Sequence, residues 1–369
     1  MIPVNRPLID EKDLDFVTTT LRETYISGDT PIVGQLEAKL AETVGTEFAV
    51  AVNSGTSALD LVSEALGLDQ NSEVIAPTFT IISTVSHLIR RKAKLLLIDA
   101  DEKTWSMNSE VTANKVSKKT SAIFPVHIYG LPVDLNEIIS ASEKFDVPII
   151  EDAAEALGLY YNGRHCGSFG KASIFSFFAN KIVTGGEGGA ICTNDVEFAS
   201  KLRSLRNLCH SPDERFVHNE IGYNFRMPGL PAALIYSQLF RLSSLVDHKI
   251  AIADRYQRNL QGHPWLSFHP KTTSFASNIY WVFGIMLNDN SPFDAKSLQN
   301  ELRKRGVDTR RFFCPIHLQP AAKVSIVNVN DKFPVSEKLW NRGLYLPSGL
   351  GNTENEIDTV SEVLWGMIK

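Results

Sequence analysis

The chain has 369 residues, 43% of them hydrophobic and 21% charged, which argues against a disordered chain, a fibre or a repeat array and favours one large domain with a smaller one. The 37 Lys and Arg residues against 42 Asp and Glu give a net charge of −5, so no global basic surface is available for nucleic acid and an anionic ligand must be held locally. No stretch reaches the ~18 apolar residues of a membrane span, and segment 1–7 has no long apolar run, so we expect a cytoplasmic protein with no membrane partner.

Short β-branched or apolar runs alternate with amphipathic stretches after residue 47. This alternation predicts βαβ units, with helices covering a largely parallel sheet. The predicted strands are 48–52, 74–80, 95–99, 122–128 and 148–152, and the predicted helices are 57–66 and 135–145.

The pattern changes beyond about residue 228. A long, mostly helical stretch at 230–252 precedes a strand at 279–287, a helix at 295–305, a strand at 307–313 and a helix at 357–368. This order predicts a small α+β domain that packs closely on the first and shares a cleft with it. We place the large domain at 1–245 and the small one at 246–369.

The four cysteines are widely separated, at positions 166, 192, 209 and 314. They form no CxxC pair and no cluster with His at zinc-ligand spacing. We therefore expect neither a metal site nor a disulfide framework.

A possible anion cradle lies at 53–57, Asn-Ser-Gly-Thr-Ser, between a predicted strand and a predicted helix. Glycine allows close approach of the backbone, and the free N–H groups at a helix start attract phosphate. Ser54 and Thr56 could equally be ordinary helix caps.

Acidic residues follow the apolar strand end at 147–150. Ligands of open α/β sheets bind outside the carboxyl ends of the strands, so Asp152 is well placed to meet one. A plain polar strand end is the alternative.

Lys181 lies between an apolar run and the glycine-rich segment 185–189. A partly desolvated lysine has a lowered pKa and can attack a carbonyl to form a Schiff base. A single lysine is more often a solvated surface residue, but the flanking Phe177 and Phe178 argue against that here. Pyridoxal 5′-phosphate (PLP) requires an anion cradle, a carboxylate that keeps its pyridine nitrogen protonated, and a lysine that forms the Schiff base. The three occur along this chain in that order.

Six motifs in sequence then identify a resemblance that runs nearly end to end. They are 53–59, 76–80, 125–130, 151–155, 181–189 and 222–227. The chain resembles the PLP-dependent sugar aminotransferases of the DegT/DnrJ/EryC1/StrS family. The resemblance implies an α/β fold of the fold-type I aminotransferases, with a large seven-stranded mixed-sheet domain and a small α+β C-terminal domain.

The resemblance also implies roles for individual residues. Lys181 would bind the cofactor covalently and shuttle protons, with the cofactor in its pyridoxamine form (PMP) for part of turnover. Asp152 would pair with the pyridinium nitrogen, and Glu155 would lie near the 3-hydroxyl.

The phosphate would be held by the amides of Gly55 and Thr56, the Ser176 hydroxyl, and Asn224 of a second subunit, so the active form would be a homodimer with shared active sites. One departure is Ile81, where many relatives place an aromatic residue on the pyridine ring. An aliphatic side chain can still sandwich that ring.

Within the family, segments 176–181, 278–281 and 310–317 look most like the GDP-perosamine synthases. This implies L-glutamate as donor and C4 of a GDP-linked 4-keto-6-deoxy sugar as acceptor, while C4 or C3 amination of dTDP- or UDP-linked keto-sugars stays open. The candidates for sugar binding are Tyr280, Arg310, Arg311 and His317, with a weaker case for His127 and Arg226.

Three other classes compete with an aminotransferase. A PMP-dependent sugar dehydratase typically has His in place of the lysine, so Lys181 argues against it. A non-catalytic nucleotide-sugar binding protein would not need the intact trio of cradle, carboxylate and lysine. A dinucleotide-dependent oxidoreductase would carry the spaced three-glycine fingerprint, which the cradle lacks.

Overall fold

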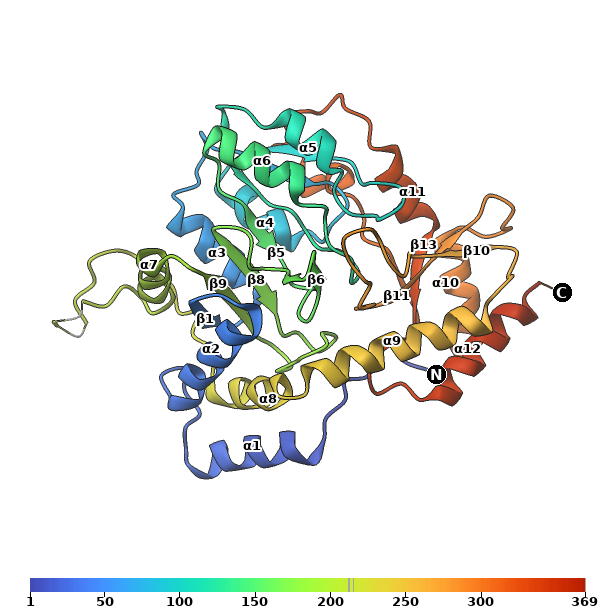
Figure 1. The fold of residues 1–369 in the computed structure, drawn as a ribbon, viewed down its shortest axis with the longest axis horizontal. Coiled ribbons are helices and arrows are strands. Elements are labelled where there is room, and N and C mark those ends of the chain that lie inside the picture. The colour runs from blue at the N-terminus through green and yellow to red at the C-terminus, as the bar shows by residue number, and fades with distance from the viewer. Residues whose placement is uncertain (212, 215, 369) are drawn as a thin grey trace.

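The computed structural model describes residues 1–211, 213–214 and 216–368, and within them a four-stranded and a three-stranded ladder join into one mixed sheet (Figure 1). The ladders meet through the parallel bridges Ile123–Ile149 and Val126–Asp152. All neighbours are parallel except β9, which runs antiparallel to β8 and β1. The order across the sheet is β3 (Lys94–Ile98), β2 (Glu73–Pro77), β4 (Thr120–Ile123), β5 (Ile150–Asp152), β8 (Ala172–Ser176), β9 (Gly189–Thr193) and β1 (Phe48–Val52). The predicted seven-stranded mixed sheet is confirmed.

Two predicted strands are shorter than their apolar runs. The strand predicted at 122–128 ends at Ile123, and the strand predicted at 74–80 ends at Pro77. Proline cannot donate to a ladder, and Pro125 follows Ile123 by two residues. The chain nevertheless stays beside β5, because the Asp152 N–H donates to the Pro125 oxygen at 2.9 Å.

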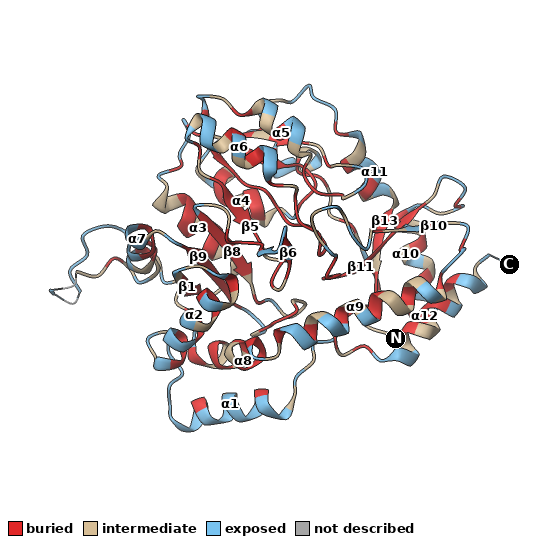
Figure 2. Ribbon diagram, in the orientation of Figure 1, coloured by how far each residue is buried: buried red, intermediate tan, exposed pale blue. Residues whose placement is uncertain are grey.

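Helices cover both faces of this sheet. The predicted helices at 57–66 and 135–145 are confirmed as α3 (Gly55–Ala65) and α6 (Asn136–Phe145). The others are α1 (Glu11–Arg22), α2 (Pro31–Val44), α4 (Ser83–Arg90), α5 (Ser109–Lys115) and α7 (Val196–Arg206), with a small hairpin of β6 (Tyr160–Tyr161) and β7 (Arg164–His165). In Figure 2 the buried residues concentrate in the strands and on the inward faces of the helices, whereas α1 is largely exposed.

The long helix predicted at 230–252 is two helices, α8 (Gly229–Leu239) and α9 (Leu242–Asn259). The break falls at Phe240 and Arg241, where the Arg241 guanidinium binds Asp10 and Asp13 at the start of α1. Figure 1 shows the result: α8 lies between α1 and the large sheet, and α9 runs on to a second sheet.

The second sheet is antiparallel, with the strand order β10 (Leu266–Phe268), β11 (Phe283–Leu287), β13 (Gly343–Leu346) and β12 (Arg310–Arg311). The strand predicted at 279–287 begins only at Phe283, since Tyr280 has a φ of 50° and turns the chain. The strand predicted at 307–313 shrinks to two residues. The remaining elements are α10 (Ala295–Lys304), α11 (Pro334–Arg342), α12 (Glu354–Gly366) and two 3-10 turns, η1 (Ile316–Leu318) and η2 (Pro320–Ala322).

Two connections cross between the sheets. Ile2 pairs with Val307 beside the second sheet, and Ile326 returns to pair with Leu95 at the edge of the large one. Helix α9 runs through residue 245, so the proposed domain boundary stays a prediction. Within the described part of the chain, no helix is both long and apolar enough to cross a membrane.

Candidate active site

A cavity of about 410 Å³ opens where the carboxyl ends of β5 and β8 meet the start of α3. Its walls come from segments that are far apart in sequence but adjacent in the sheet. Six of the seven predicted cofactor-binding residues line it together: Gly55, Thr56, Asp152, Glu155, Ser176 and Lys181. Ile81 lines the same cavity and is 46% exposed.

The start of α3 forms one end of the cavity. The Ser54 hydroxyl accepts from the Ser57 N–H at 3.1 Å, so Ser54 is the helix cap that the sequence allowed it to be. Gly55 and Thr56 follow it as the first helical residues, whose amides have no acceptor within a helix. A Cβ on Gly189 would lie 2.3 Å from the Ser54 carbonyl carbon, so only glycine allows β9 to pass this close to the helix start.

Asp152, the last residue of β5, lines the same cavity. It is only 3% exposed, and its two carboxylate oxygens accept from the Thr84 hydroxyl at 2.8 Å and the Ala154 N–H at 3.2 Å. Burial raises the pKa of Asp152 above its ordinary value, and these hydrogen bonds offset part of that effect. A cationic group in the cavity would therefore stabilise the ionised carboxylate.

Lys181 and Glu155 form a pair in the same cavity, with side chains that are 12% and 7% exposed. The lysine Nζ lies 3.8 Å from Glu155 Oε1, and Glu155 Oε2 accepts from the Tyr129 N–H at 2.8 Å. Burial lowers the pKa of Lys181 and raises the pKa of Glu155 to about 7, while each charge partly offsets the shift of the other. An amine that gives up its proton readily is what a carbonyl nucleophile requires.

These residues fit PLP. The helix start and Ser176 suit a phosphate, Asp152 suits a protonated ring nitrogen, and Lys181 suits the aldehyde. The fit rests on a buried carboxylate, a lysine and the amides of a helix start that line one cavity.

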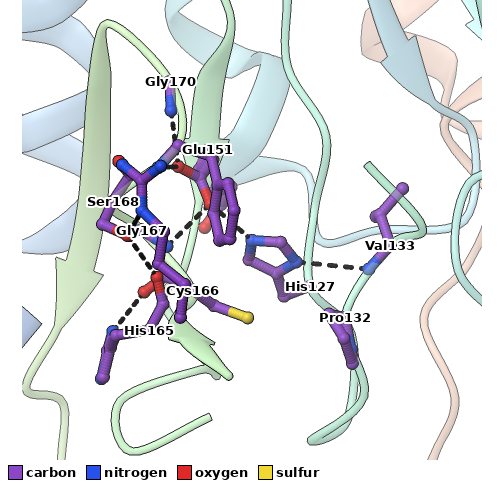
Figure 3. Close-up of polar contacts among 12 residues, drawn as sticks. His127, Pro132, Val133, Glu151, His165, Cys166, Gly167, Ser168 and Gly170 are labelled. Carbon is purple, nitrogen blue, oxygen red and sulfur yellow. Dashed lines mark hydrogen bonds and ion pairs between the residues drawn. The ribbon is translucent and has the colours of Figure 1, made fainter. Parts of the chain in front are cut away.

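Glu151 precedes Asp152 in β5, and Figure 3 shows its side chain between His127 and the segment that holds Gly167 and Gly170. No separate role was predicted for it from the sequence. It is fully buried and accepts from the amides of Gly167 at 2.7 Å and Gly170 at 2.8 Å, as well as from His127 Nε2 at 3.1 Å. The Val133 N–H donates to His127 Nδ1, which fixes the hydrogen on Nε2. Burial alone would raise the pKa of Glu151, but the hydrogen bonds from His127 and the amides lower it below its usual value.

The weaker sugar candidate His127 is therefore fully buried against Glu151 and does not line the cavity. Neighbouring residues of a strand point to opposite faces of the sheet. The adjacent positions of Glu151 and Asp152 therefore indicated that only one of the two side chains would face the cavity. Arg226 donates to the Asn207 side chain at 2.6 Å, and Asn224 pairs with Asn207 through the backbone. The role of Asn224 across a dimer stays a prediction.

The four main sugar candidates are each bound to neighbours outside the cavity lining. The Tyr280 hydroxyl accepts from Gln257 at 2.9 Å, and the exposed Arg310 pairs with Asp308 at 2.8 Å. Their contact with a sugar stays a prediction.

The same holds for the other two candidates. The Arg311 guanidinium stacks 4.9 Å from the Trp340 ring centre. His317 bonds Thr78 at 2.7 Å and Glu337 at 3.2 Å, so it ties the C-terminal segment to the end of β2.

Three aromatic side chains from the C-terminal part do line the cavity: Trp281, Phe313 and Tyr345. Trp281 and Phe313 lie within segments used for the family resemblance, but no role was assigned to them. Tyr345 carried no local signal, since it is one residue of a short strand. Among the residues that the structure describes, no group of His, Cys, Asp or Glu is arranged to hold a metal ion.

Comparison with known proteins agrees with this geometry. The DegT/DnrJ/EryC1/StrS aminotransferase family matches residues 7–365. The chain is 34% identical to a GDP-perosamine synthase of Escherichia coli O157:H7 over 94% of its own length and 93% of the relative, and 31% identical to one of Caulobacter vibrioides over 98% and 97%. The aminotransferase TlmJ of Streptoalloteichus hindustanus superimposes with a TM-score of 0.92 at 26% identity, covering 100% of this chain and 99% of that one. The chain therefore belongs to the DegT/DnrJ/EryC1/StrS aminotransferase family and is a PLP-dependent sugar aminotransferase.

Proposed function

We propose that the protein transfers an amino group from L-glutamate to C4 of GDP-4-keto-6-deoxy-D-mannose and so forms GDP-perosamine. The observation that carries an amino transfer is the placement of Lys181 beside Glu155 and across from Asp152, in a cavity that begins at a helix amino terminus. The GDP-linked substrate is favoured by the relatives named as GDP-perosamine synthases, which match nearly the whole chain.

PLP, when bound, supplies an electron-withdrawing ring, which stabilises the negative charge that forms on the carbon attached to the amino nitrogen when that carbon loses its proton. Asp152 would hold the ring nitrogen protonated, and its burial makes that charge pairing strong. Ser176 and the amides at the start of α3 would hold the phosphate and so orient the ring.

Lys181 Nζ would carry the proton in both halves of the reaction. In the first half it would take the α-proton of glutamate; the amino group would stay with the cofactor, and water would supply the oxygen of the 2-oxoglutarate that leaves. In the second half the direction would reverse: the amino group would pass to the keto-sugar, whose keto oxygen would leave as water. Glu155, 3.8 Å from Lys181 Nζ, would stabilise the lysine whenever it is protonated.

The site would be completed by a second copy of the chain, with Asn224 of that copy reaching the phosphate. Amination at C3, or of a dTDP- or UDP-linked keto-sugar, is the alternative for the acceptor. A sugar dehydration is disfavoured, because the dehydratases of this family typically have His in place of the lysine, and this chain has Lys181.

One spectroscopic experiment tests both halves. The purified protein is treated with glutamate until the cofactor absorbance of the resting enzyme disappears, the glutamate is removed, and GDP-4-keto-6-deoxymannose is added. Return of the original band, together with an amino-sugar nucleotide by mass spectrometry, is expected. A return only with dTDP- or UDP-linked keto-sugars would overturn the GDP assignment, and no bleaching by glutamate would overturn the donor.

A further inference from the structure

Trp281 lies against the Lys181 amine, although 100 positions separate them in sequence. The lysine Nζ is 3.8 Å from the centre of the Trp281 ring. The indole N–H also donates to the backbone oxygen of Asn180 at 3.0 Å. Trp281 is only 4% exposed, so both contacts are shielded from water.

The backbone before Trp281 is locked in place by the loop after β4. Ile279 N–H donates to the Gly130 oxygen at 3.0 Å, and a Cβ on Gly130 would lie 2.7 Å from the Trp281 nitrogen. Tyr280 adopts a φ of 50°, and its N–H donates to the Asn278 side chain at 2.7 Å. These contacts fix the position of the Trp281 ring against the lysine amine.

Several charged or titratable groups face Lys181. Burial lowers the pKa of Lys181, whereas Glu155 and then Asp152 raise it. Tyr345 and Glu187 line the same cavity, and Lys249 lines a small adjoining pocket together with Lys181. Burial lowers the pKa of Lys249 to about 7. Trp281, by contrast, carries no charge, and its ring face contacts the amine.

An aromatic face attracts a cation, and the attraction grows when both are removed from water. We propose that Trp281 is an electrostatic partner of Lys181: its ring face stabilises the protonated amine, and its indole N–H anchors the backbone that carries it. This inference rests on the role proposed for Lys181 and is independent of which sugar is the acceptor.

The test measures how fast the full-length, cofactor-free protein captures added PLP as a function of pH. Only the deprotonated amine attacks the aldehyde, so the midpoint of the rate profile reports the pKa of Lys181. Loss of the ring face in Trp281→Leu should move this midpoint down by about one pH unit. Trp281→Phe keeps a ring face that attracts a cation less strongly than indole, so its midpoint should lie between those of the wild type and Trp281→Leu. It should also release PLP faster, because the N–H anchor is lost.

Trp265→Leu removes a tryptophan that packs on Phe293 in the region of the second sheet, and it should leave the midpoint unchanged. Mono- and difluorotryptophan at position 281 keep the shape of the ring while weakening its negative face. A stepwise fall of the midpoint with fluorination would support the proposal even if the leucine variant does not fold.

Borohydride reduction followed by peptide mapping identifies the lysine that has captured PLP. Trapping at Lys181 with equal midpoints in the wild type and the difluoro protein would overturn the role of Trp281 alone. Trapping at another lysine would overturn the role proposed for Lys181 and this inference with it.

Discussion

The cofactor end of the cavity and the segment expected to bind the sugar differ in how their polar groups are held. Asp152 and Glu155 are buried and Lys181 is nearly so, and the pKa of each is shifted by burial and by its neighbours. Arg310 and Arg311 instead have partners outside the cavity, a surface carboxylate and a tryptophan ring. Buried charges in one cavity depend on each other, whereas exposed pairs contribute little.

This difference indicates at which end of the site a bound ligand would stabilise the protein more. At the cofactor end, a bound cation beside Asp152 and a bond to Lys181 would relieve unfavourable burial of charge. At the sugar end, a ligand would first have to compete with contacts that already exist. We therefore expect substitutions to have large effects at the first site and small effects at the second.

The largest expected effect is that of Lys181→Ala. Loss of the amine removes the group that moves protons, and transamination should fall by roughly 10³-fold or more. The measurement is turnover of glutamate with the keto-sugar, alongside circular dichroism as a check on folding. Turnover close to wild type in a folded variant would refute the assignment.

Asp152→Asn should have the next largest effect. The side chain keeps its size but loses the charge, so kcat should fall about 100-fold, with a smaller change in KM. Thr84→Val is the matched control, because it removes the hydrogen bonds of the Thr84 hydroxyl to Asp152 and Thr80 but keeps the charge of Asp152. An Asp152→Asn variant no slower than Thr84→Val would show that the charge is not used.

Glu155→Gln should change how stability depends on pH. The pKa of Glu155 is about 7 in the folded protein and near 4.5 for the ordinary group, so the protonated carboxyl contributes stability below about pH 4.5. That contribution is lost as the pH rises through about 7. Urea unfolding of the cofactor-free protein at several pH values should show the wild type losing stability relative to Glu155→Gln over this range. Parallel curves for the two proteins would contradict the raised pKa.

The smallest effects are expected in the C-terminal segment. If Arg311 contacts the nucleotide sugar, Arg311→Ala should raise the KM for the keto-sugar about tenfold, which corresponds to the loss of one charged hydrogen bond. The KM for glutamate should change little. Arg310→Ala, which removes an exposed pair with Asp308, is the comparison and should change KM less. An unchanged KM for the keto-sugar in Arg311→Ala would rule out its proposed role.

Much of the fold and of the cofactor end could be predicted from local patterns. Apolar runs predicted the strands β1, β2, β3 and β5, because strands of a sheet covered by helices on both faces need continuous apolar sequence. Polar residues just after such strands meet at one edge of the sheet. For this reason the local pattern was enough to group Asp152 and Lys181 with the helix start at Gly55, whereas Ser176 was added by the family resemblance.

Other features depend on contacts between residues far apart in the sequence, and only the tertiary structure shows them. The break between α8 and α9, the late start of β11, and the burial of His127 against Glu151 depend on partners far along the chain. Trp281 reaches Lys181 only because Gly130 lets two distant loops touch. Local periodicity specifies which residues form a strand or helix, but contacts between separate elements are set by the packing of the whole chain, which leaves no regular spacing in the sequence.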